Sequence, residues 1–309
     1  MKNSMLKSSI LAVAAAISSF SLASSPVLAQ ETAAAPAAAE TVDIDPALWV
    51  VKDKDTTIYL FGTVHILKPG LSWFDEAVKE AFDASDELVL EIVGADDPAS
   101  QQKAMAMGTD EVTGPFREKL TPENKAAYET ALGSLGIPAA GLDQFEPWLA
   151  SITLGVVPLL AKGYDVNSGA EKVLTAQAEN DGKTLGQLET VEQQLGFFDD
   201  LPEENQIAML NAAVAAIPEI ESFVDSMVTT WGSGDTEKLA ALMNEGFSDK
   251  LVYDALLTKR NANWAEWIDT RLETPGTVFI AVGAGHLAGD TSVQAQLAKK
   301  NITTSRIEY

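Results

Sequence analysis

Cysteine is absent from the 309 residues of this chain, and histidine occurs only twice. Without cysteine the chain cannot form disulfides, offer thiolate ligands to a metal or carry a lipid anchor on an N-terminal cysteine. Imidazole is the commonest metal ligand in proteins and the side chain best suited to acid–base chemistry near neutral pH. Any site that uses imidazole must therefore be built from His65, His286 or both.

Positive charge is scarce as well. The chain has 21 lysines and arginines against 45 aspartates and glutamates, which gives a formal net charge of −24. Such a surface repels phosphate backbones and anionic lipid headgroups, so we expect neither nucleic acid nor a membrane surface as a partner. It would attract cations, although solubility alone accounts for most of this acidity.

The first 29 residues have the pattern of a secretory signal peptide. Lys2 and Lys7 flank the start, an apolar stretch covers 10–20, and small residues precede a cleavage site after Ala29. The apolar core is shorter than a bilayer span requires, which disfavours an uncleaved anchor. We therefore expect a periplasmic or secreted protein that is not inserted in a membrane after cleavage. Its net charge would be −26, because the lost segment carries two lysines and no acid.

An Ala-rich segment, residues 30–44, follows the signal peptide. It contains Pro36 and lacks the periodicity and bulk needed for packing, so we predict a flexible linker. Residues 45–309 then form the folded part. About 265 residues are enough for one large domain or two small ones. We predict one domain, because strands from its two ends are expected to share a sheet.

Strand patterns lie towards the ends of this domain, and helix patterns fill its middle. The polar turn 52–55 between the first two strands predicts a hairpin. The expected fold class is mixed α/β: a pseudo-symmetric central mixed sheet flanked by helices, with a large helical insertion. The predicted strands are 49–51, 57–61, 88–93, 184–188, 277–282 and 303–309.

Helix signals mark the middle of the chain. Thr121 is a preferred N-cap followed by proline in the first turn, and Thr190 to Gln193 forms a capping box. The run 148–161 is very apolar but too short to cross a bilayer, so we predict a buried core helix. Further helices are expected over 73–84, 207–231, 237–243 and 251–272.

Both histidines close the same short pattern, an apolar strand followed by Gly-x-x-His. Gly62 precedes His65 by three residues, and Gly283, with Gly285 after it, precedes His286 in the same way. Glycine permits a sharp turn and close approach of other groups, and functional groups gather at the carboxyl ends of strands in open α/β sheets. We expect the two imidazoles to share one site. The alternative is two separate, partly buried histidines, each bonded to a backbone carbonyl.

Two glutamates fall at similar places. Glu91 interrupts the apolar strand 88–93, and a carboxylate is almost never buried without a partner. A metal ion, a histidine or an arginine would supply that partner; the alternative is a solvent-facing side chain on an edge strand. Glu189 ends the strand before the capping Thr190, where an acid also suits the helix dipole.

A cationic residue on the last long helix is a weaker candidate. Arg260 and Trp264 are four residues apart and share a helix face. Arg260 could orient Glu91 or stabilise an anionic intermediate. Taken alone, its pattern favours a solvated charge on an amphipathic helix.

The ordered set of these motifs resembles the TraB/GumN family, which is related to the Tiki proteases. The resemblance covers the chain from Pro46 to Tyr309. The motifs that carry it are Leu60-Phe61-Gly62-Thr63-Val64-His65, Leu88-Val89-Leu90-Glu91, Gln187-Leu188-Glu189-Thr190, Arg260-Asn261-x-x-Trp264 and Val282-Gly283-Ala284-Gly285-His286-Leu287.

This resemblance implies a pseudo-symmetric α/β core and a metal-dependent peptidase activity. It implies that His65 and His286 are metal-associated, that Glu91 is a ligand or general base, and that Arg260 and Asn261 line the site. Oxygen and nitrogen donors suit Mn, Co or Zn. A bound ion would acidify its water into a nucleophile, and a second carboxylate such as Glu189 could pass a proton to a leaving amine.

The expected function is therefore a metal-dependent hydrolase that acts on a peptide or another small-molecule substrate. One alternative is a non-catalytic protein that binds haem or a peptide in the same pocket, and another, suggested only by the family's name, is a role in exopolysaccharide biology. A dinucleotide fingerprint is excluded because 283–289 has one residue too many between its glycines. The chain also lacks a Gly-x-Ser-x-Gly elbow and a phosphate-binding loop.

Overall fold

The computed structural model describes residues 41–309, except 110–113 and 247–248. The predicted signal peptide and residues 30–40 of the predicted linker lie outside the described residues. The end of that linker is structured: Val42–Asp43 forms strand β1, which pairs in parallel with β4 (Leu71–Ser72). Folded structure therefore begins slightly before residue 45, because the backbone of Val42 and Ile44 bonds to Gly70 and Ser72.

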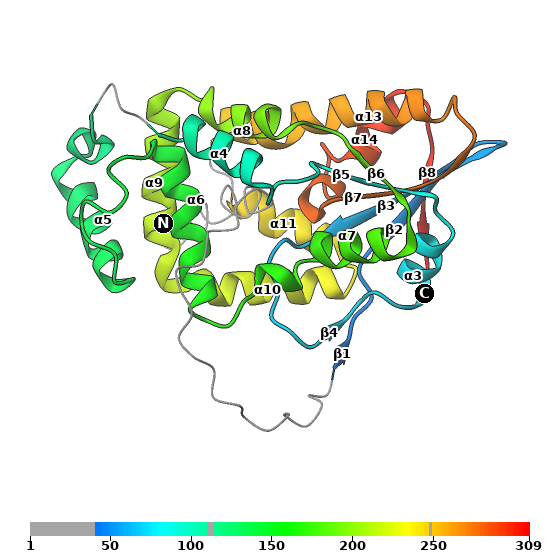
Figure 1. The fold of residues 1–309 in the computed structure, drawn as a ribbon, viewed down its shortest axis with the longest axis horizontal. Coiled ribbons are helices and arrows are strands. Elements are labelled where there is room, and N and C mark those ends of the chain that lie inside the picture. The colour runs from blue at the N-terminus through cyan, green and yellow to red at the C-terminus, as the bar shows by residue number, and fades with distance from the viewer. Residues whose placement is uncertain (1–40, 110–113, 247–248) are drawn as a thin grey trace.

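A mixed sheet of six strands forms the centre of the described chain, in the order β6-β5-β7-β3-β2-β8 (Figure 1). The strands β6, β5, β7 and β3 run parallel to one another, while β2 is antiparallel to both β3 and β8. The predicted hairpin and the mixed α/β class are confirmed. The strands are β2 (Leu48–Lys52), β3 (Thr56–Thr63), β5 (Glu87–Leu90), β6 (Thr184–Gln187), β7 (Gly276–Gly283) and β8 (Thr304–Ile307).

The repeated strand motif occupies the middle of the sheet. β3 and β7 are parallel neighbours whose register places Gly62 opposite Val282 and Thr63 opposite Gly283. The two Gly-x-x-His segments therefore leave the sheet side by side. The two strands differ in their outer neighbours. The outer neighbour of β3 is the antiparallel strand β2, and the outer neighbour of β7 is the parallel strand β5.

Period-two alternation divides the strand side chains between two cores. Phe279 and Ala281 of β7 face one helical layer, and Val278, Ile280 and Val282 face the other. The first layer consists of α3 (Glu76–Asp83), α7 (Ala170–Asp181), α10 (Ile220–Gly232) and α11 (Thr236–Gly246). The second consists of α13 (Lys259–Arg271) and α14 (Val293–Lys299). The sheet is thus covered on both faces.

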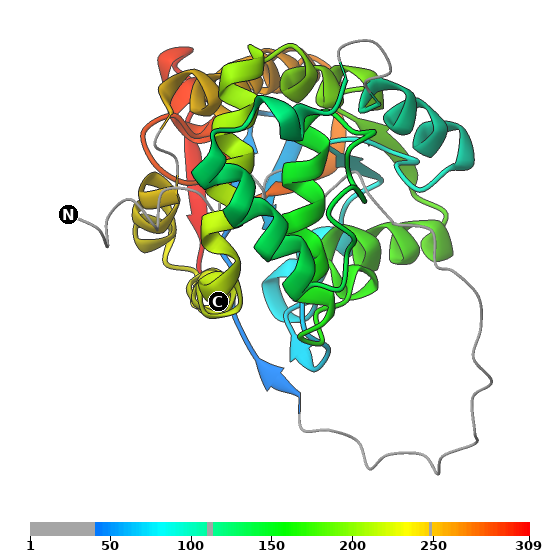
Figure 2. The ribbon, with the colours of Figure 1, turned by 90° about the vertical axis from the view of Figure 1, so that its left-hand side faces the viewer.

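A helical lobe extends beyond the end of the sheet, at the left of Figure 1 and facing the viewer in Figure 2. Its cores form around α6 (Pro147–Leu160), which packs along α9 (Glu203–Ala216). The predicted buried helix is confirmed, because eleven residues of α6 are buried. The lobe also contains α4 (Pro98–Met107), α5 (Pro122–Ser134) and α8 (Val191–Asp199), with the Thr121 cap of α5 and the capping box of α8 as predicted.

Two helices predicted as continuous are interrupted. The stretch 207–231 divides at the short turn η4 (Ile217–Glu219), where Pro218 lacks the N–H that a continuous helix needs. By length and composition 203–232 could also cross a membrane, but its residues Leu210, Val224 and Trp231 are buried in the protein cores. The stretch 251–272 divides into α12 (Lys250–Tyr253), a π-helical turn η5 (Asp254–Thr258) and α13.

Candidate functional site

Four parallel strands deliver side chains to one edge of the sheet. His65 follows the end of β3 by two residues, Glu91 directly follows β5, and Glu189 lies two residues past β6. His286 lies in the turn η6 (Ala284–Leu287), which follows β7. Because β6, β5, β7 and β3 are consecutive in the sheet, their carboxyl ends form one crevice, as open α/β sheets do. The structure therefore brings both histidines and both glutamates together.

Glu91 lies at the centre of this crevice and is 3% exposed. The predicted strand 88–93 ends at Leu90, so Glu91 does not interrupt a strand as we expected. Beyond the strand, the backbone N–H of Glu189 still donates to the carbonyl of Glu91, and the N–H of Val93 donates to the side chain of Gln187. One carboxylate oxygen of Glu91 accepts from the backbone N–H of Gly283 at 2.7 Å, and the other accepts from Gln194 Nε2 at 2.6 Å. The alternative of a solvent-facing side chain is wrong.

Arg260 is fully buried behind Glu91, so the interpretation of a solvated charge is also wrong. Its Nη2 donates to Glu91 Oε2 at 2.6 Å and to Glu189 Oε2 at 2.8 Å, and its Nε donates to Glu189 Oε1 at 2.9 Å. Trp264 completes the shell by donating from Nε1 to Glu189 at 2.9 Å, while its ring lies beside the guanidinium. A single positive charge therefore serves two buried carboxylates.

The electrostatics distinguish the two glutamates. Burial alone would raise the pKa of Glu91, but the charge of Arg260, with contributions from both histidines, lowers it to about 2. Burial outweighs Arg260 at Glu189, and the pKa of that carboxyl is raised above its ordinary value. Glu91 is therefore the carboxylate that stays ionised most firmly. Arg260 itself is held charged, because the attraction of Glu91 and Glu189 exceeds the cost of burial and raises its pKa.

His286 is fixed as a neutral tautomer. Its Nδ1 lies 2.6 Å from Asn261 Oδ1, while Asn261 Nδ2 donates to the carbonyl of Thr291. The amide oxygen must therefore accept from Nδ1–H, which leaves Nε2 as an acceptor. Arg260 Nη1 lies 3.1 Å from that Nε2. Burial and the charge of Arg260 lower the pKa of His286 to about 3, so its Nε2 stays unprotonated across the physiological range and accepts from Arg260.

His65 is held from the opposite side by Glu171, which belongs to the first turn of α7. Glu171 Oε1 contacts His65 Nδ1 and also accepts a hydrogen bond from Thr63 Oγ1. The imidazole is thus fixed with Nε2 towards Glu91. Burial alone would lower the pKa of His65, but the charge and hydrogen bond of Glu171, with the charge of Glu91, raise it above its ordinary value.

This ion pair predicts a pH-dependent stability. A raised histidine pKa stabilises the fold below the ordinary value of 6.5, and this contribution disappears as pH rises through the folded pKa. Glu171→Gln should therefore lower the free energy of unfolding by about 1.5–3 kcal/mol at pH 6, and by less at pH 9. Urea unfolding at both pH values measures the difference.

The surface pair of Glu192 with Lys103 provides the control for that measurement. Glu192→Gln should change the stability by less than about 1 kcal/mol, equally at pH 6 and pH 9. A loss in Glu171→Gln that stays constant or grows with pH would contradict the assigned pairing.

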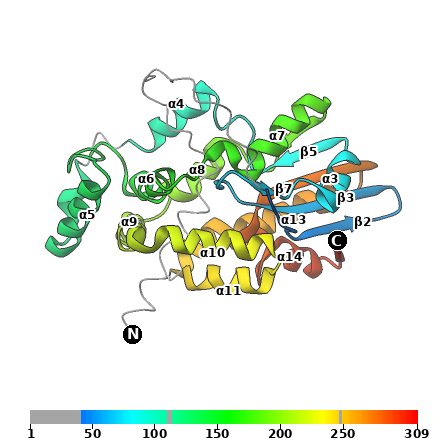
Figure 3. The same ribbon diagram turned by 90° about the horizontal axis from the view of Figure 1, so that it is seen from below.

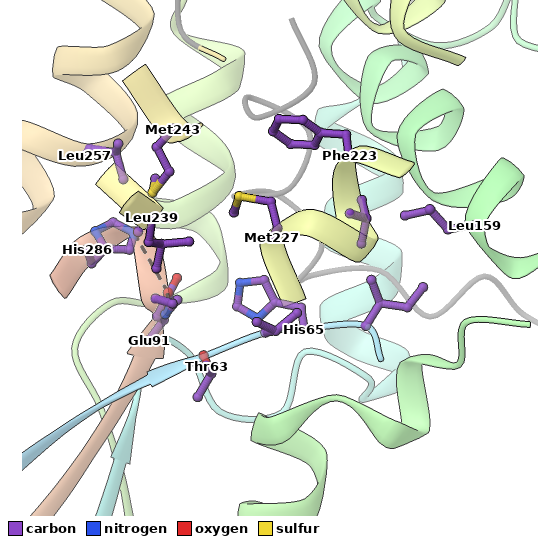
Figure 4. A pocket seen from close by; sticks show the side chains of 16 residues that line it. Thr63, His65, Glu91, Leu159, Phe223, Met227, Leu239, Met243, Leu257 and His286 are labelled. Atoms are coloured by element: carbon purple, nitrogen blue, oxygen red, sulfur yellow. Dashed lines mark hydrogen bonds and ion pairs between the residues drawn. The ribbon is translucent and has the colours of Figure 1, made fainter. Parts of the chain in front are cut away.

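A cavity of about 80 Å³ opens above this cluster. Figure 4 shows His65, Glu91 and His286 at its base, with methionine and leucine side chains above them. Among the described residues its lining includes those three polar side chains but not Glu189, Arg260 or Asn261. These last three lie behind the cavity, where Arg260 and Asn261 contact Glu91 and His286 and Glu189 pairs with Arg260.

The donor set is suited to a divalent ion, with one adjustment. Each imidazole is bonded at Nδ1 to an oxygen and presents Nε2, which is how metal-bound histidines are usually oriented. Gly283 leaves room between the donors: a Cβ there would lie 3.2 Å from Glu91 Oε1, 3.3 Å from His65 Nε2 and 3.6 Å from His286 Cδ2. Arg260 Nη1, however, lies beside His286 Nε2. Accordingly, no group of three acidic, histidine or cysteine side chains in the described chain converges as an ion would require.

Glycines allow the two histidine turns to pack together. A Cβ on Gly62 would lie 2.9 Å from the Cα of Ala284, and a Cβ on Gly285 would overlap the end of Met243. Sequence reasoning found these glycines, both histidines, Glu91, Glu189, Arg260 and Asn261. It missed Glu171 and Gln194, which hold His65 and Glu91. The available signal for Glu171 was Gly169 just before it, where a Cβ would lie 2.2 Å from the carbonyl oxygen of His65.

The chain resembles a known protein and a protein family over most of its length. The chain is 24% identical over 280 residues to an uncharacterized protein of Treponema pallidum (strain Nichols). The aligned region covers 82% of this chain and 80% of that protein. No solved structure gives a significant match. A model of the TraB/PrgY/gumN family matches residues 47–306, which include every strand end of the crevice. The chain therefore belongs to the TraB/PrgY/gumN family.

Proposed function

We propose that this protein is a periplasmic or secreted hydrolase that cleaves peptides at the crevice, with a divalent metal ion as cofactor. One observation supports this above all: two imidazoles and a carboxylate, each oriented by a partner of its own, face the same small cavity. Such pre-orientation is what catalytic and metal-binding side chains need.

His65, Glu91 and His286 would hold the ion, once Arg260 gives up its contact with His286 Nε2. His65, whose pKa is raised, would also have to release its Nε2 proton. The ion would be Mn, Co or Zn. When bound, it would polarise a carbonyl and lower the pKa of its water.

The protein's own residues have supporting tasks. Arg260 keeps Glu91 ionised and directed at the cavity through their 2.6 Å bond. Asn261 fixes the His286 tautomer, and Glu171 fixes the ring of His65. The apolar cavity wall keeps bulk water away, so that charges at the base interact more strongly.

Metal content tests this proposal. The mature chain, beginning at Gln30, should bind about one ion of Mn, Co or Zn per molecule after chelator treatment and reloading. His65→Ala and His286→Ala should each weaken binding by more than about 100-fold, because removing a ligand should exceed the 10–100-fold loss seen for outer partners. Glu266→Gln, on the exposed face of α13, should bind like the wild type. Equal metal content in wild type and both histidine variants, or no metal in any of them, would refute the proposed metal site.

Digestion of a peptide library separates the hydrolase from a non-catalytic binding protein. The loaded wild type should cleave peptides and lose this activity with a chelator, while Glu91→Gln should cleave none. Haem is a poor alternative ligand for this pocket, since a cavity of about 80 Å³ is smaller than the 150 Å³ cavity that binds benzene. A visible spectrum that shifts on haem addition, together with an undigested library, would favour the binding protein.

A further inference from the structure

The cavity above the polar cluster has apolar walls. Phe223 and Met227 of α10 form one side, and Leu239 and Met243 of α11 form the other. Figure 3 shows these two helices running side by side, and Figure 4 shows both methionine side chains directed towards the histidines. Leu159 of α6 lies on the side of Phe223, and Leu257 of the π-helical turn lies on the side of Met243. Apart from Thr63, His65, Glu91 and His286 at the base, every described residue that lines the cavity is apolar or glycine.

We propose that this cavity is the recognition pocket for an aliphatic or thioether side chain of the substrate, next to the bond that reacts. The proposal rests on the proposed function, because it takes the polar base as the reaction centre. An apolar wall cannot satisfy a charged or amide side chain, whose burial without partners costs several kcal/mol. The pocket should therefore reject such residues and accept Leu, Met, Ile or Val.

The volume of the cavity limits which apolar side chains can enter it. Its volume of about 80 Å³ is near half that of an engineered cavity of 150 Å³ that holds benzene. An aromatic ring would therefore require the walls to move. Met227 and Met243 can adapt to branched or straight aliphatic chains, because unbranched thioethers repack easily. Gly285 contributes to this shape, since a Cβ on it would lie 2.1 Å from Met243 Cε.

Methionine methyl NMR tests the pocket without requiring activity. The mature chain is labelled at its methionine methyls in the Glu91→Gln background and titrated with the N-acetyl amides of Leu, Phe and Asp. The leucine amide should shift the methyl signals of Met227 and Met243 and bind at least about 10-fold more tightly than the other two, as contacts of one or two carbons typically discriminate. The methyl of Met105, exposed on α4, should not move.

Pocket variants complete the test. Met227→Ala should enlarge the cavity and reverse the order of the leucine and phenylalanine amides. Leu239→Phe should fill it and weaken leucine-amide binding at least about 10-fold. Leu251→Phe, at an exposed position of α12, should bind like the parent. The methyl signal of Met209, buried in the helical lobe, reports whether each variant is folded.

The outcomes separate the two proposals. Methyl shifts with no cleavage of the peptide library by wild type would support the pocket and refute the hydrolase. Cleavage without a preference for aliphatic residues, together with silent Met227 and Met243 methyls, would support the hydrolase and overturn the pocket. Tightest binding of the aspartate amide would overturn the pocket as well.

Discussion

Replacing Arg260 with methionine is expected to lower the free energy of unfolding by about 3–5 kcal/mol, the usual cost of removing one partner from a buried ion pair. The guanidinium is buried and bonded to Glu91 and Glu189, which are themselves 3% and 7% exposed. Without it, both carboxylates must lose their charge or open the site to water. For a domain of this size the loss corresponds to a decrease in Tm of roughly 6–20 °C.

The pH dependence identifies the cause of that loss. The lowered pKa of Glu91, about 2 in the folded state, stabilises the wild type above its ordinary value of 4.5, and this contribution is lost as pH falls towards 2. In Arg260→Met both carboxylates lose their strongest positive partner, so both become easier to protonate. The stability difference between wild type and variant should therefore be largest near pH 7 and shrink towards pH 3.

A second arginine on the same helix provides a matched control. Arg271 also pairs with a glutamate, Glu87 at 3.5 Å, but its side chain is 18% exposed. Arg271→Met should cost no more than about 1 kcal/mol. Arg260→Lys keeps the charge but loses the planar fork, and should fall between wild type and Arg260→Met. A loss below about 1 kcal/mol in Arg260→Met would mean that the guanidinium does not hold the cluster together.

If the proposed peptide cleavage takes place at the crevice, Gly283→Ala is expected to reduce its catalytic efficiency by about 100-fold or more while leaving stability within about 1 kcal/mol. The backbone at Gly283 has φ −48° and ψ 132°, which alanine adopts without strain. The added methyl, however, would press on Glu91 Oε1 and His65 Nε2 at 3.2 and 3.3 Å. Displacements of this kind are costly for catalysis, since about 1 Å can cost 100-fold.

Two other glycine-to-alanine variants serve as controls for Gly283→Ala. Gly133 lies inside α5 with nothing within 4 Å of an added Cβ, so Gly133→Ala should stabilise the chain by about 0.5–1 kcal/mol and leave cleavage unchanged. Gly62→Ala brings a methyl against the backbone of Ala284 and should lower stability by about 1–3 kcal/mol. Measuring kcat/KM and urea unfolding for the three variants checks these expectations. Full activity in Gly283→Ala would show that the space beside it is not used.

Much of the crevice followed from local sequence patterns. Strand ends are readable because apolar runs stop at glycine or at a charged residue, and the parallel sheet then gathers those ends at one edge. This reasoning placed His65, Glu91, Glu189 and His286 correctly. The helix-face argument also paired Arg260 with Trp264, and both contact Glu189.

The supporting residues were harder to predict because helix packing, and not local pattern, decides where they point. Glu171 is an acid in a first helical turn, which the helix dipole favours on many helices with no site nearby. The neighbouring Lys259 made Arg260 resemble a solvated charge. Hydrophobic periodicity also does not predict the π-helical turn just before α13. In this turn the Leu256 carbonyl accepts a hydrogen bond from Arg260 Nη1 at 3.2 Å.

The pairing of β3 with β7 has a consequence for the newly made chain. More than 200 residues separate the two strands, yet each is the other's neighbour along its whole length. Until the segment 276–283 is free to pair, one edge of β3 exposes unpaired amide and carbonyl groups, which invites association with other chains. Early handling by a chaperone should therefore matter more for this protein than for one whose first strands find partners close by.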